Sequence, residues 1–282
     1  MPELIADTGK LRERMNAVRR GNLSIGFVPT MGALHAGHAK LLEIARQEND
    51  FVVASIFVNP LQFDRKEDLD AYPQTLEADL KVCDDCGVDL VFAPTVQALY
   101  PREQLTFVEA PSLAEYLCGR YRPGHFRGAA TVVLKLFNIV QPDRAYFGEK
   151  DAQQLAIIRR MVQDLNVPVS VAPVATVREP DGLALSSRNK HLTPAQREIA
   201  PVLSLALRTA VDLIENGERS VAAIRERVLP LFAAYPEVRI EYFEVSDPDT
   251  LTPIEHISGS VLIAGAIFLG STRLIDNISK RI

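Results

Sequence analysis

The chain has 282 residues, of which 47% are hydrophobic and 24% are charged, and its formal net charge is −5 at neutral pH. This composition is typical of a globular protein with a substantial core, and the length suits one large domain or two ordinary ones. The acidic balance argues against a surface for duplex nucleic acid, because such surfaces usually carry a basic excess.

The segments best placed to act as an export signal or a membrane anchor do not fit those roles. Residues 1–20 are charged throughout and lack the apolar centre of a secretory signal. The most apolar run, residues 261–270, is about half the length needed to cross a bilayer. The three cysteines suit a reducing compartment. We therefore expect a cytoplasmic protein with no membrane or nucleic-acid partner.

The first 176 residues alternate short apolar runs with longer amphipathic segments. Continuous apolar strands separated by helices indicate a parallel sheet that is covered on both faces. We therefore expect a doubly wound, Rossmann-like α/β domain over residues 1–176. The expected strands are residues 23–28, 51–58, 88–94, 145–148 and 167–174. Four helices are expected: one after Gly37, one that ends near Cys86, one that includes Val132 to Val140, and one that starts at Asp151.

Beyond residue 176 the pattern changes to that of a smaller α+β domain, which we expect over residues 177–282 and which would close over the site. Residues 178–190 are polar and contain a Pro-Asp-Gly turn. Thr193, Pro194 and Gln196 have the pattern of a capping box with proline in the first turn, which predicts a helix to about Gly217. A second helix is expected from Ser220 to Pro236, followed by strands at 238–245, 261–269 and 272–278, the last two forming a hairpin.

Cys83 and Cys86 have the C-x-x-C spacing of half a zinc site or a redox pair. No second pair completes a four-cysteine site, and two aspartates between the thiols should raise their pKa rather than lower it. We favour the simpler interpretation, the end of a helix with Gly87 as its stop signal.

The stretch PTMGALHAGH at residues 29–38 follows the first apolar strand and precedes a helix. Ligands bind at the carboxyl ends of strands in open α/β sheets, and a helix start offers free N–H groups and the positive end of its dipole to a phosphate. The spacing from Gly32 to Gly37 matches a P-loop, but His38 replaces the lysine and Ala39 replaces the magnesium-binding hydroxyl.

His35 and His38 are three residues apart and so share one face of a helical turn. Both imidazoles can then donate to charge that develops during displacement at phosphorus. The alternative is two ordinary histidines in a loop. The position directly after a buried strand favours the functional interpretation.

Two further polar groups follow predicted strands. Asn59 and Gln62 suit a substrate that carries hydroxyls beside a carboxylate, although Asn-Pro also starts ordinary solvated turns. Lys150 can neutralise phosphate charge and Asp151 can accept from a ribose hydroxyl. The alternative for Asp151 is a helix cap, with Gln154 completing a capping box.

Two candidate groups lie outside the strand ends. Ser186, Ser187 and Arg188 suit phosphate oxygens on a loop that can close over a ligand, but on these residues alone we prefer the interpretation as a solvated linker. The second group is a basic patch made up of Arg120, Arg122, His125 and Arg127. It could attract an anionic substrate, or it could be an ordinary surface loop or a subunit contact, and we leave its role unassigned.

PTMGALHAGH resembles the first signature of the pantoate–β-alanine ligase (pantothenate synthetase) family, within the H-x-G-H superfamily of nucleotidylyltransferases and class I aminoacyl-tRNA synthetases. IFVNPLQF (56–63), YFGEKDAQQ (146–154) and LALSSRN (183–189) resemble the other blocks of this family, in the same order. The resemblance covers essentially the whole chain.

The resemblance implies that ATP and pantoate give pantoyl adenylate, which β-alanine converts to pantothenate and AMP. It implies Mg²⁺ as a companion of ATP and a homodimer. It implies catalytic roles for His35, His38, Lys150 and Arg188, and substrate contacts from Asn59, Gln62 and Gln154, with Gln62 also near β-alanine. It assigns to the ATP site Met31, Gly32, Ala33, Leu34, His35, Ala36, Gly37, His38, Gly148, Glu149, Lys150, Asp151, Val177, Leu185, Ser186, Ser187 and Arg188.

Two alternatives remain open from sequence alone. One is an H-x-G-H enzyme that transfers AMP to a phosphate, which would need a cation where this chain has Gln62 and Gln154. The other is a regulatory nucleotide-binding module without catalysis. A class I synthetase is disfavoured because nothing resembles a tRNA-binding appendage. Four apolar residues are expected to contact the methyl groups of pantoate, although packing in the core explains their presence nearly as well: Pro29, Met31, Phe57 and Val133.

Overall fold

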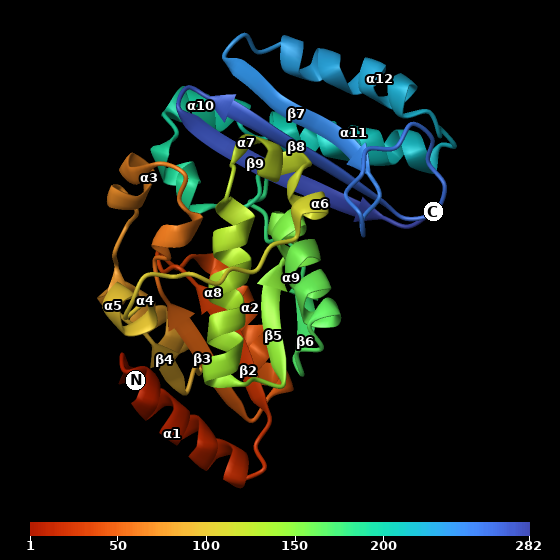
Figure 1. Ribbon diagram of the computed structural model, residues 1–282. Coiled ribbons are helices and arrows are strands. Elements are labelled where there is room, and N and C mark those ends of the chain that lie inside the picture. The colour runs from red at the N-terminus through yellow and green to blue at the C-terminus, as the bar shows by residue number, and fades with distance from the viewer. The chain divides into compact units, whose positions relative to one another are not determined.

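The computed structural model describes all residues from 1 to 282 (Figure 1). Contacts group the chain into two compact units that interleave along the sequence. The first unit comprises Met1–Ala110, Arg122–Gly148 and Ile157–Ala175, and the second comprises Pro111–Tyr121, Glu149–Ala156 and Thr176–Ile282. No helix in either unit combines the length and the apolar character needed to cross a bilayer.

The first unit is built on a six-stranded sheet in the order β1-β4-β3-β2-β5-β6, and every neighbouring pair is parallel. The chain moves outward from β2 to β3 and β4 on one side, and from β5 to β6 on the other, so the direction of winding switches between β2 and β5. The expected doubly wound sheet is confirmed. Its strands are β1 Glu3–Ile5, β2 Ile25–Thr30, β3 Phe51–Ile56, β4 Leu90–Phe92, β5 Arg144–Gly148 and β6 Ser170–Val174.

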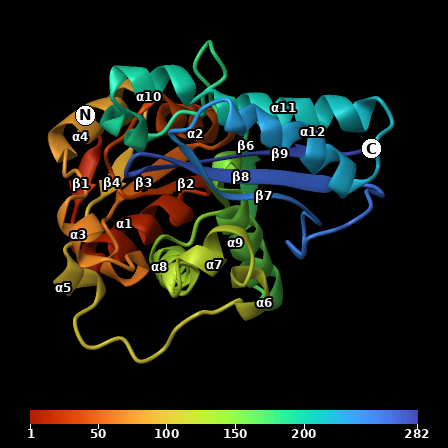
Figure 2. The same ribbon diagram turned by 90° about the horizontal axis from the view of Figure 1, so that it is seen from above.

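Helices cover both faces of this sheet. In Figure 2, α2 and α4 lie on one side of the strands, and α1 and α8 lie on the other. α2 packs on β2, β3, β5 and β6, whereas α8 packs on β2 and on α1. Burial on both faces explains why the strands are continuously apolar. The helices are α1 Thr8–Arg20, α2 Ala36–Glu48, α3 Lys66–Asp70, α4 Leu76–Asp85, α5 Val96–Leu99, α8 His125–Val140 and α9 Ala152–Asp164, with a 3₁₀ turn η1 at Pro60–Gln62.

The second unit contains a three-stranded antiparallel sheet in the order β7-β8-β9, covered by α11 and α12. The predicted hairpin is confirmed: β8 and β9 pair with Leu269 opposite Thr272 across a tight turn at Gly270. The bounds are β7 Val238–Ser246, β8 Val261–Leu269, β9 Thr272–Lys280, α6 Pro111–Ala114, α7 Leu117–Tyr121, α10 Pro194–Ile199, α11 Val202–Glu215, α12 Val221–Ala233, and 3₁₀ turns η2 Glu149–Asp151 and η3 Ser187–His191.

The helix expected from Thr193 to about Gly217 is in fact two helices. Its start is as predicted, with a reciprocal capping box between Thr193 and Gln196. The expectation of one continuous helix was wrong, because α10 ends at Ile199 and α11 begins at Val202. The intervening Pro201 has no N–H for the carbonyl four residues earlier, so the hydrogen-bond ladder is interrupted.

The C-x-x-C segment is the end of α4, as the simpler interpretation predicted. Cys86 is the C-cap residue and Gly87 follows with φ of 71°. Both thiols are free, and burial raises the pKa of Cys83 to about 12, with further contributions from Asp79 and Cys86. A buried thiol that keeps its proton is a poor nucleophile.

Candidate active site

The turn that follows β2 is held by a buried carboxylate from α4. Asp79 is 2% exposed, and its two oxygens accept from the backbone N–H groups of Ala33 at 3.0 Å and Leu34 at 2.8 Å. Gly32 and Ala33 both have left-handed backbone, with φ of 82° and 52°. A Cβ at Gly32 would lie 2.9 Å from the Asp79 carboxylate, so the turn requires glycine there.

His35 and His38 cap the start of α2 reciprocally. The Nδ1 atom of His35 accepts from the N–H of Gly37 at 3.1 Å, and Nδ1 of His38 accepts from the N–H of His35 at 3.3 Å. Neither imidazole is buried, and the two ring centroids are 4.2 Å apart. Because each Nδ1 acts as an acceptor, the ring proton of a neutral imidazole is on Nε2.

This arrangement changes how a phosphate would be bound at the helix start. The sequence suggested free backbone N–H groups, but those of Ala33, Leu34, His35 and Gly37 all have side-chain acceptors here. That expectation was wrong for these four groups, because Asp79 and the imidazoles occupy them. The ring donor that each neutral imidazole can offer to an anion is its Nε2–H group, and the helix dipole favours an anion at this end of α2.

Asn59 and Gln62 lie in a buried turn rather than a solvated one. They are 1% and 7% exposed. The Nδ2 atom of Asn59 donates to Oε1 of Gln62 at 3.0 Å and to the carbonyl of Gly128 at 3.1 Å. A Cβ at Gly128 would lie 2.2 Å from the carbonyl oxygen of Leu61, so glycine allows α8 to pack directly against this turn.

His125 fixes the backbone of the same turn. Its Nδ1 lies 2.7 Å from the carbonyl oxygen of Gln62, and its Nε2 lies 3.3 Å from Nη1 of Arg122. A carbonyl only accepts and a guanidinium only donates, so Nδ1 carries the proton and Nε2 accepts. Arg122 also pairs with Asp64 at 3.3 Å.

Three members of the basic patch that was left unassigned have partners in the first unit, where Arg122 and His125 contact each other and Arg127 has partners of its own. Arg127 pairs with Glu109 at 3.2 Å and lies 3.7 Å from the centre of the Phe107 ring. Burial opposes ionisation of Asp64, but a backbone hydrogen bond and Arg122 outweigh it and lower the pKa of that carboxyl. In the first unit the patch serves packing and the positioning of Gln62.

The expected apolar walls differ in exposure. Phe57 and Val133 are buried, whereas Pro29 and Met31 are half-buried. Sδ of Met31 accepts from Nε2 of Gln62 at 3.0 Å. Core packing is sufficient to explain Phe57 and Val133, and Met31 lies beside a predicted substrate residue.

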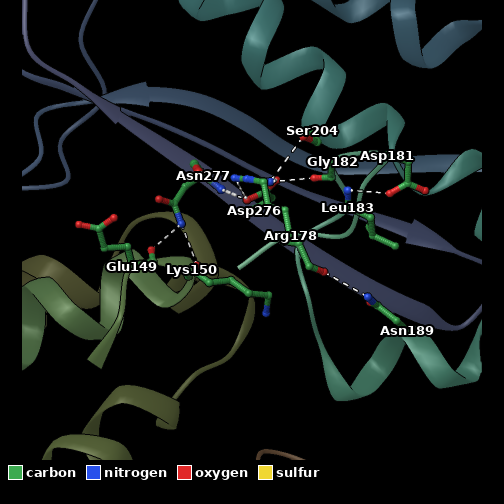
Figure 3. Close-up of polar contacts among 11 residues, drawn as sticks. Glu149, Lys150, Arg178, Asp181, Gly182, Leu183, Asn189, Ser204, Asp276 and Asn277 are labelled. Carbon is green, nitrogen blue, oxygen red and sulfur yellow. Dashed lines mark hydrogen bonds and ion pairs between the residues drawn. The ribbon is translucent and has the colours of Figure 1, made fainter. Parts of the chain in front are cut away.

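Other predicted residues belong to the second unit, where β9 supports them (Figure 3). The carbonyl groups of Glu149 and Lys150 accept from Nδ2 of Asn277 at 2.9 and 2.8 Å. Asn277 is 7% exposed, so this buried amide fixes the backbone of the Lys150 turn. The Lys150 side chain is half-buried, and Asp151 is exposed.

The loop with Val177 and residues 185–188 is tethered by ion pairs. Arg178 forms a bidentate pair with Asp276 of β9, with Nη2 at 2.9 Å from Oδ1, and donates to the carbonyl of Gly182 (Figure 3). Arg197 of α10 bridges Glu179 and Asp181. The predicted Pro-Asp-Gly turn is present, with φ of 93° at Gly182.

Within this unit the loop brings two predicted residues together. Lys150 and Ser186 line one pocket, together with Asn189 and Asp276. Ser186 caps η3 by accepting from the N–H of Arg188 at 3.2 Å. The Arg188 side chain is exposed. Gln154 is half-buried on α9.

Sequence reasoning missed several residues that support these groups. Gln153, next to the predicted Gln154, is buried and bonds to residues 113, 116 and 119. Asp79 and Asn277 are distant in sequence from the turns they hold. Their signal was weak, because α4 and β9 contain several other charged and polar residues from which the sequence does not distinguish them.

Comparison with known proteins agrees with this arrangement. The sequence profile of the family described as pantoate-beta-alanine ligase matches residues 3–279. A pantothenate synthetase of Moorella thermoacetica is 54% identical over 276 residues, which is 98% of each chain.

Two solved structures are similar over nearly the whole chain. Pantothenate synthetase from Thermus thermophilus has a TM-score of 0.92 at 46% identity, covering 98% of both chains. Pantoate-beta-alanine ligase from Francisella tularensis, solved in complex with beta-gamma ATP and beta-alanine, has a TM-score of 0.80 at 33% identity, covering 99% of this chain and 97% of that one. The family match, the fold and the paired imidazoles after β2 together show that the chain belongs to the pantoate–β-alanine ligase family.

Proposed function

We propose that this chain condenses pantoate with β-alanine in two steps. The pantoate carboxylate attacks the α-phosphorus of ATP, so an acyl–oxygen–phosphorus link forms and the bond to pyrophosphate breaks. The amine of β-alanine then attacks the acyl carbon, a C–N bond forms, AMP leaves and the nitrogen loses a proton. A carboxylate is already ionised at pH 7, so the first step needs alignment and charge stabilisation rather than a general base.

The observation that carries this proposal is the reciprocal capping of His35 and His38. Each ring accepts through Nδ1 inside the protein, so a neutral imidazole carries its proton on Nε2, and we propose that this N–H donates to phosphate oxygens. Such donors are already oriented before ATP binds, so they cost no reorganisation during the reaction. His38 is the first candidate for an essential residue, with His35 beside it.

Residues of both units are proposed to contribute to the ATP site. In the first unit these are residues 31–38 and Gly148. In the second they are residues 149–151, Val177 and residues 185–188, with Lys150 and Arg188 supplying positive charge. The tethered backbone of the Lys150 turn supports a fixed position for that ammonium. Closure of the smaller domain over bound substrates is part of the proposal.

Pantoate is proposed to contact Gln62 and Gln154, with Asn59 beside them and β-alanine near Gln62. Glutamine suits a substrate with hydroxyls and a carboxylate because a neutral amide neither repels nor strongly holds the anion. An enzyme that transfers AMP to a phosphate would need a cation at these positions. The base that deprotonates β-alanine is not assigned.

Mg²⁺ is proposed to bind together with ATP, where it would offset the charge of the phosphates. No group of three or more His, Cys, Asp or Glu residues is arranged to hold a metal ion. The side chains thus do not form a protein cage for Mg²⁺, and no step is assigned to it. Mg²⁺ commonly binds through substrate phosphates and waters. Titration of Mg²⁺ at several ATP concentrations tests this, because the optimum should follow the concentration of ATP.

We also propose a cytoplasmic homodimer. Light scattering coupled to gel filtration should give twice the 31.2 kDa mass of one chain. A monomer of undiminished activity would contradict the proposed assembly.

The activity is tested by an assay with ATP, pantoate and β-alanine from which each is omitted in turn. Exchange of labelled pyrophosphate into ATP should require pantoate but not β-alanine, and AMP should appear only when β-alanine is present. Exchange without pantoate would contradict the proposed first step. A regulatory module would show no exchange at all.

A further inference from the structure

Tyr100 is the C-cap residue of α5 and belongs to none of the family motifs, yet its hydroxyl reaches the buried turn of Asn59 and Gln62. The hydroxyl donates to Oδ1 of Asn59 at 2.9 Å. Burial raises the pKa of Tyr100, so the phenol keeps its proton at neutral pH and remains a donor. The same oxygen of Asn59 accepts from the N–H of Leu61 at 3.4 Å.

These partners fix which way the Asn59 amide points. The carbonyl of Gly128 can only accept, so the NH₂ end of Asn59 must face it. The Oδ1 end then faces two donors, Tyr100 and Leu61. A flipped amide would place its oxygen against the Gly128 carbonyl and its NH₂ group against the N–H of Leu61, and both contacts would be unfavourable.

The orientation of Asn59 in turn fixes that of Gln62. The second hydrogen of Nδ2 goes to Oε1 of Gln62 at 3.0 Å. The acceptor of Gln62 is therefore used inside the protein, and its Nε2 faces Sδ of Met31, which is a weak acceptor. One of the two Nε2 hydrogens of Gln62 thus faces Met31, and the other is the donor that Gln62 can offer to a ligand.

We propose that Tyr100 is a positioning residue that acts through Asn59 to hold the Gln62 amide with its NH₂ group toward pantoate. The inference rests on the proposed role of Gln62 at that substrate. An oriented NH₂ group donates to the carboxylate or hydroxyl oxygens of pantoate, whereas a flipped amide would place its own oxygen against the carboxylate. Asn59 then supports Gln62 and does not itself touch the substrate.

The phenol ring is held independently of its hydroxyl. Its centre is 4.8 Å from the Lys135 ammonium and 6.1 Å from the centre of the Phe57 ring. Lys135 also donates to Gln104 at 3.2 Å. Replacement of Tyr100 by phenylalanine therefore keeps these ring contacts and removes only the donor to Asn59.

The test is the Tyr100→Phe variant, assayed for pantoate-dependent pyrophosphate exchange. Loss of one hydrogen bond that orients the amide should raise KM for pantoate about tenfold, with KM for ATP unchanged and kcat within about twofold of the parent. An unchanged KM for pantoate in a folded Tyr100→Phe protein would overturn the inference.

Tyr146→Phe is the matched control. The Tyr146 hydroxyl is also bonded to an asparagine, Asn49 at 2.6 Å, and to Glu48 at 2.9 Å, and neither of these partners is proposed to bind substrate. This control should lower Tm without changing KM for pantoate. An equal rise of KM in both variants would show a general structural effect and would overturn the inference.

A double-mutant cycle with Gln62→Ala tests whether Tyr100 acts through Gln62. In the Gln62→Ala background, Tyr100→Phe should have no further effect on KM for pantoate, whereas additive effects would overturn the inference. If Gln62→Ala alone leaves KM for pantoate unchanged, the proposed role of Gln62 fails and the inference fails with it. If Gln62→Ala raises KM but Tyr100→Phe does not, only the inference fails.

Asn59→Asp provides a second variant in case Tyr100→Phe is poorly folded. The substitution keeps the shape but replaces the Nδ2 donor by an oxygen facing the Gly128 carbonyl and Oε1 of Gln62. KM for pantoate should then rise by more than in Tyr100→Phe. A smaller rise of KM, in protein with a normal circular dichroism spectrum, would contradict the proposal that Tyr100 acts through Asn59 on Gln62.

Discussion

Two segments of the chain are proposed to meet phosphates, the turn at residues 30–38 and the loop at residues 177–191, and they are held in different ways. The first is fixed by one buried carboxylate, Asp79, that accepts from backbone N–H groups, and by two imidazoles that cap a helix. The second is fixed by guanidinium groups that pair with carboxylates, namely Arg178 with Asp276 and Arg197 with Glu179 and Asp181.

The two segments differ in how strongly their order depends on solution conditions. Hydrogen bonds to a buried carboxylate are short-range and poorly screened by salt, so the order of the first segment should depend little on ionic strength. In the second segment the pairs made by Arg197 lie at partly exposed positions, where ion pairs are worth little singly and weaken with salt and acid. The first segment is therefore preorganised, and the second is the one whose order depends on conditions.

The largest expected effect tests the first segment through His38. His38→Ala should lower kcat by about 10²–10³, the usual cost of one donor to a developing charge. His38→Asn separates the two roles of the ring, because its amide oxygen can still accept from the N–H of His35 while the Nε2–H donor is lost. It should keep a Tm near the parent value but lose turnover like the alanine variant.

Steady-state kinetics and thermal unfolding of both His38 variants measure this, with exposed His256 replaced by alanine as the control. Near-normal turnover in His38→Asn would show that the ring acts only as a helix cap.

The next effect tests the second segment through Arg178. Asp276 is 4% exposed, so Arg178→Met leaves a buried carboxylate without its partner and should lower the free energy of unfolding by about 3 kcal/mol. Denaturant titration measures this. Replacing Asp276 by leucine in the same protein should restore part of the loss, because the unpaired charge is removed. No recovery would indicate that packing of the guanidinium, not its charge, stabilises the loop.

A smaller effect is expected from Asp79→Asn in the first segment. One of the two acceptor oxygens becomes an NH₂ group facing a backbone N–H, which should cost about 1–3 kcal/mol of stability. Turnover should fall by about tenfold because the Ala33 turn loses its position next to the imidazoles. Asp85→Asn, on the exposed end of the same helix, is the control. Equal behaviour of the two variants would rule out the role of Asp79.

The architecture could be predicted because its signals are local. Continuous apolar runs marked the strands, and the placement of His35 and His38 after one of them marked the ligand-binding edge. The break at Pro201 also had a local signal, which the expectation of one long helix ignored. The short strand β1 had no such signal. The helix α1 did carry one that the prediction overlooked, because Leu11, Met15 and Val18 recur at helical spacing after Asp7.

The supporting residues could not be predicted because their contacts are distant in sequence. Asp79 is 45 and 46 residues from the N–H groups it holds, and Asn277 is 127 residues from the carbonyl of Lys150. Asn59 followed the pattern of a solvated turn, and only the close approach of Gly128 makes it buried. The motifs therefore predicted the chemistry of the site, whereas its rigidity depends on tertiary packing.

The smallest expected effect is the loss of stability in the loop at residues 177–191 as the pH falls. The hydrogen bond from Arg197 lowers the pKa of Asp181 against the opposing effect of burial. A lowered folded-state pKa stabilises the folded loop above the unfolded value of about 3.9, and this stabilisation is lost as pH falls through the folded value. Because the pair is largely exposed, its contribution at pH 7 should be only about 0.2–1 kcal/mol.

Amide hydrogen exchange of residues 177–191 measures this contribution, compared between pH 7 and pH 3.5 and between low and high salt after correction for intrinsic rates. Protection should fall in acid and in salt in the parent protein, while residues 30–38 should respond less to salt. In Arg197→Met the loop should begin less protected and respond less to both conditions. An equal response of the two segments would show that ion pairs do not set the order of the loop, since salt screens exposed pairs far more than hydrogen bonds to a buried carboxylate.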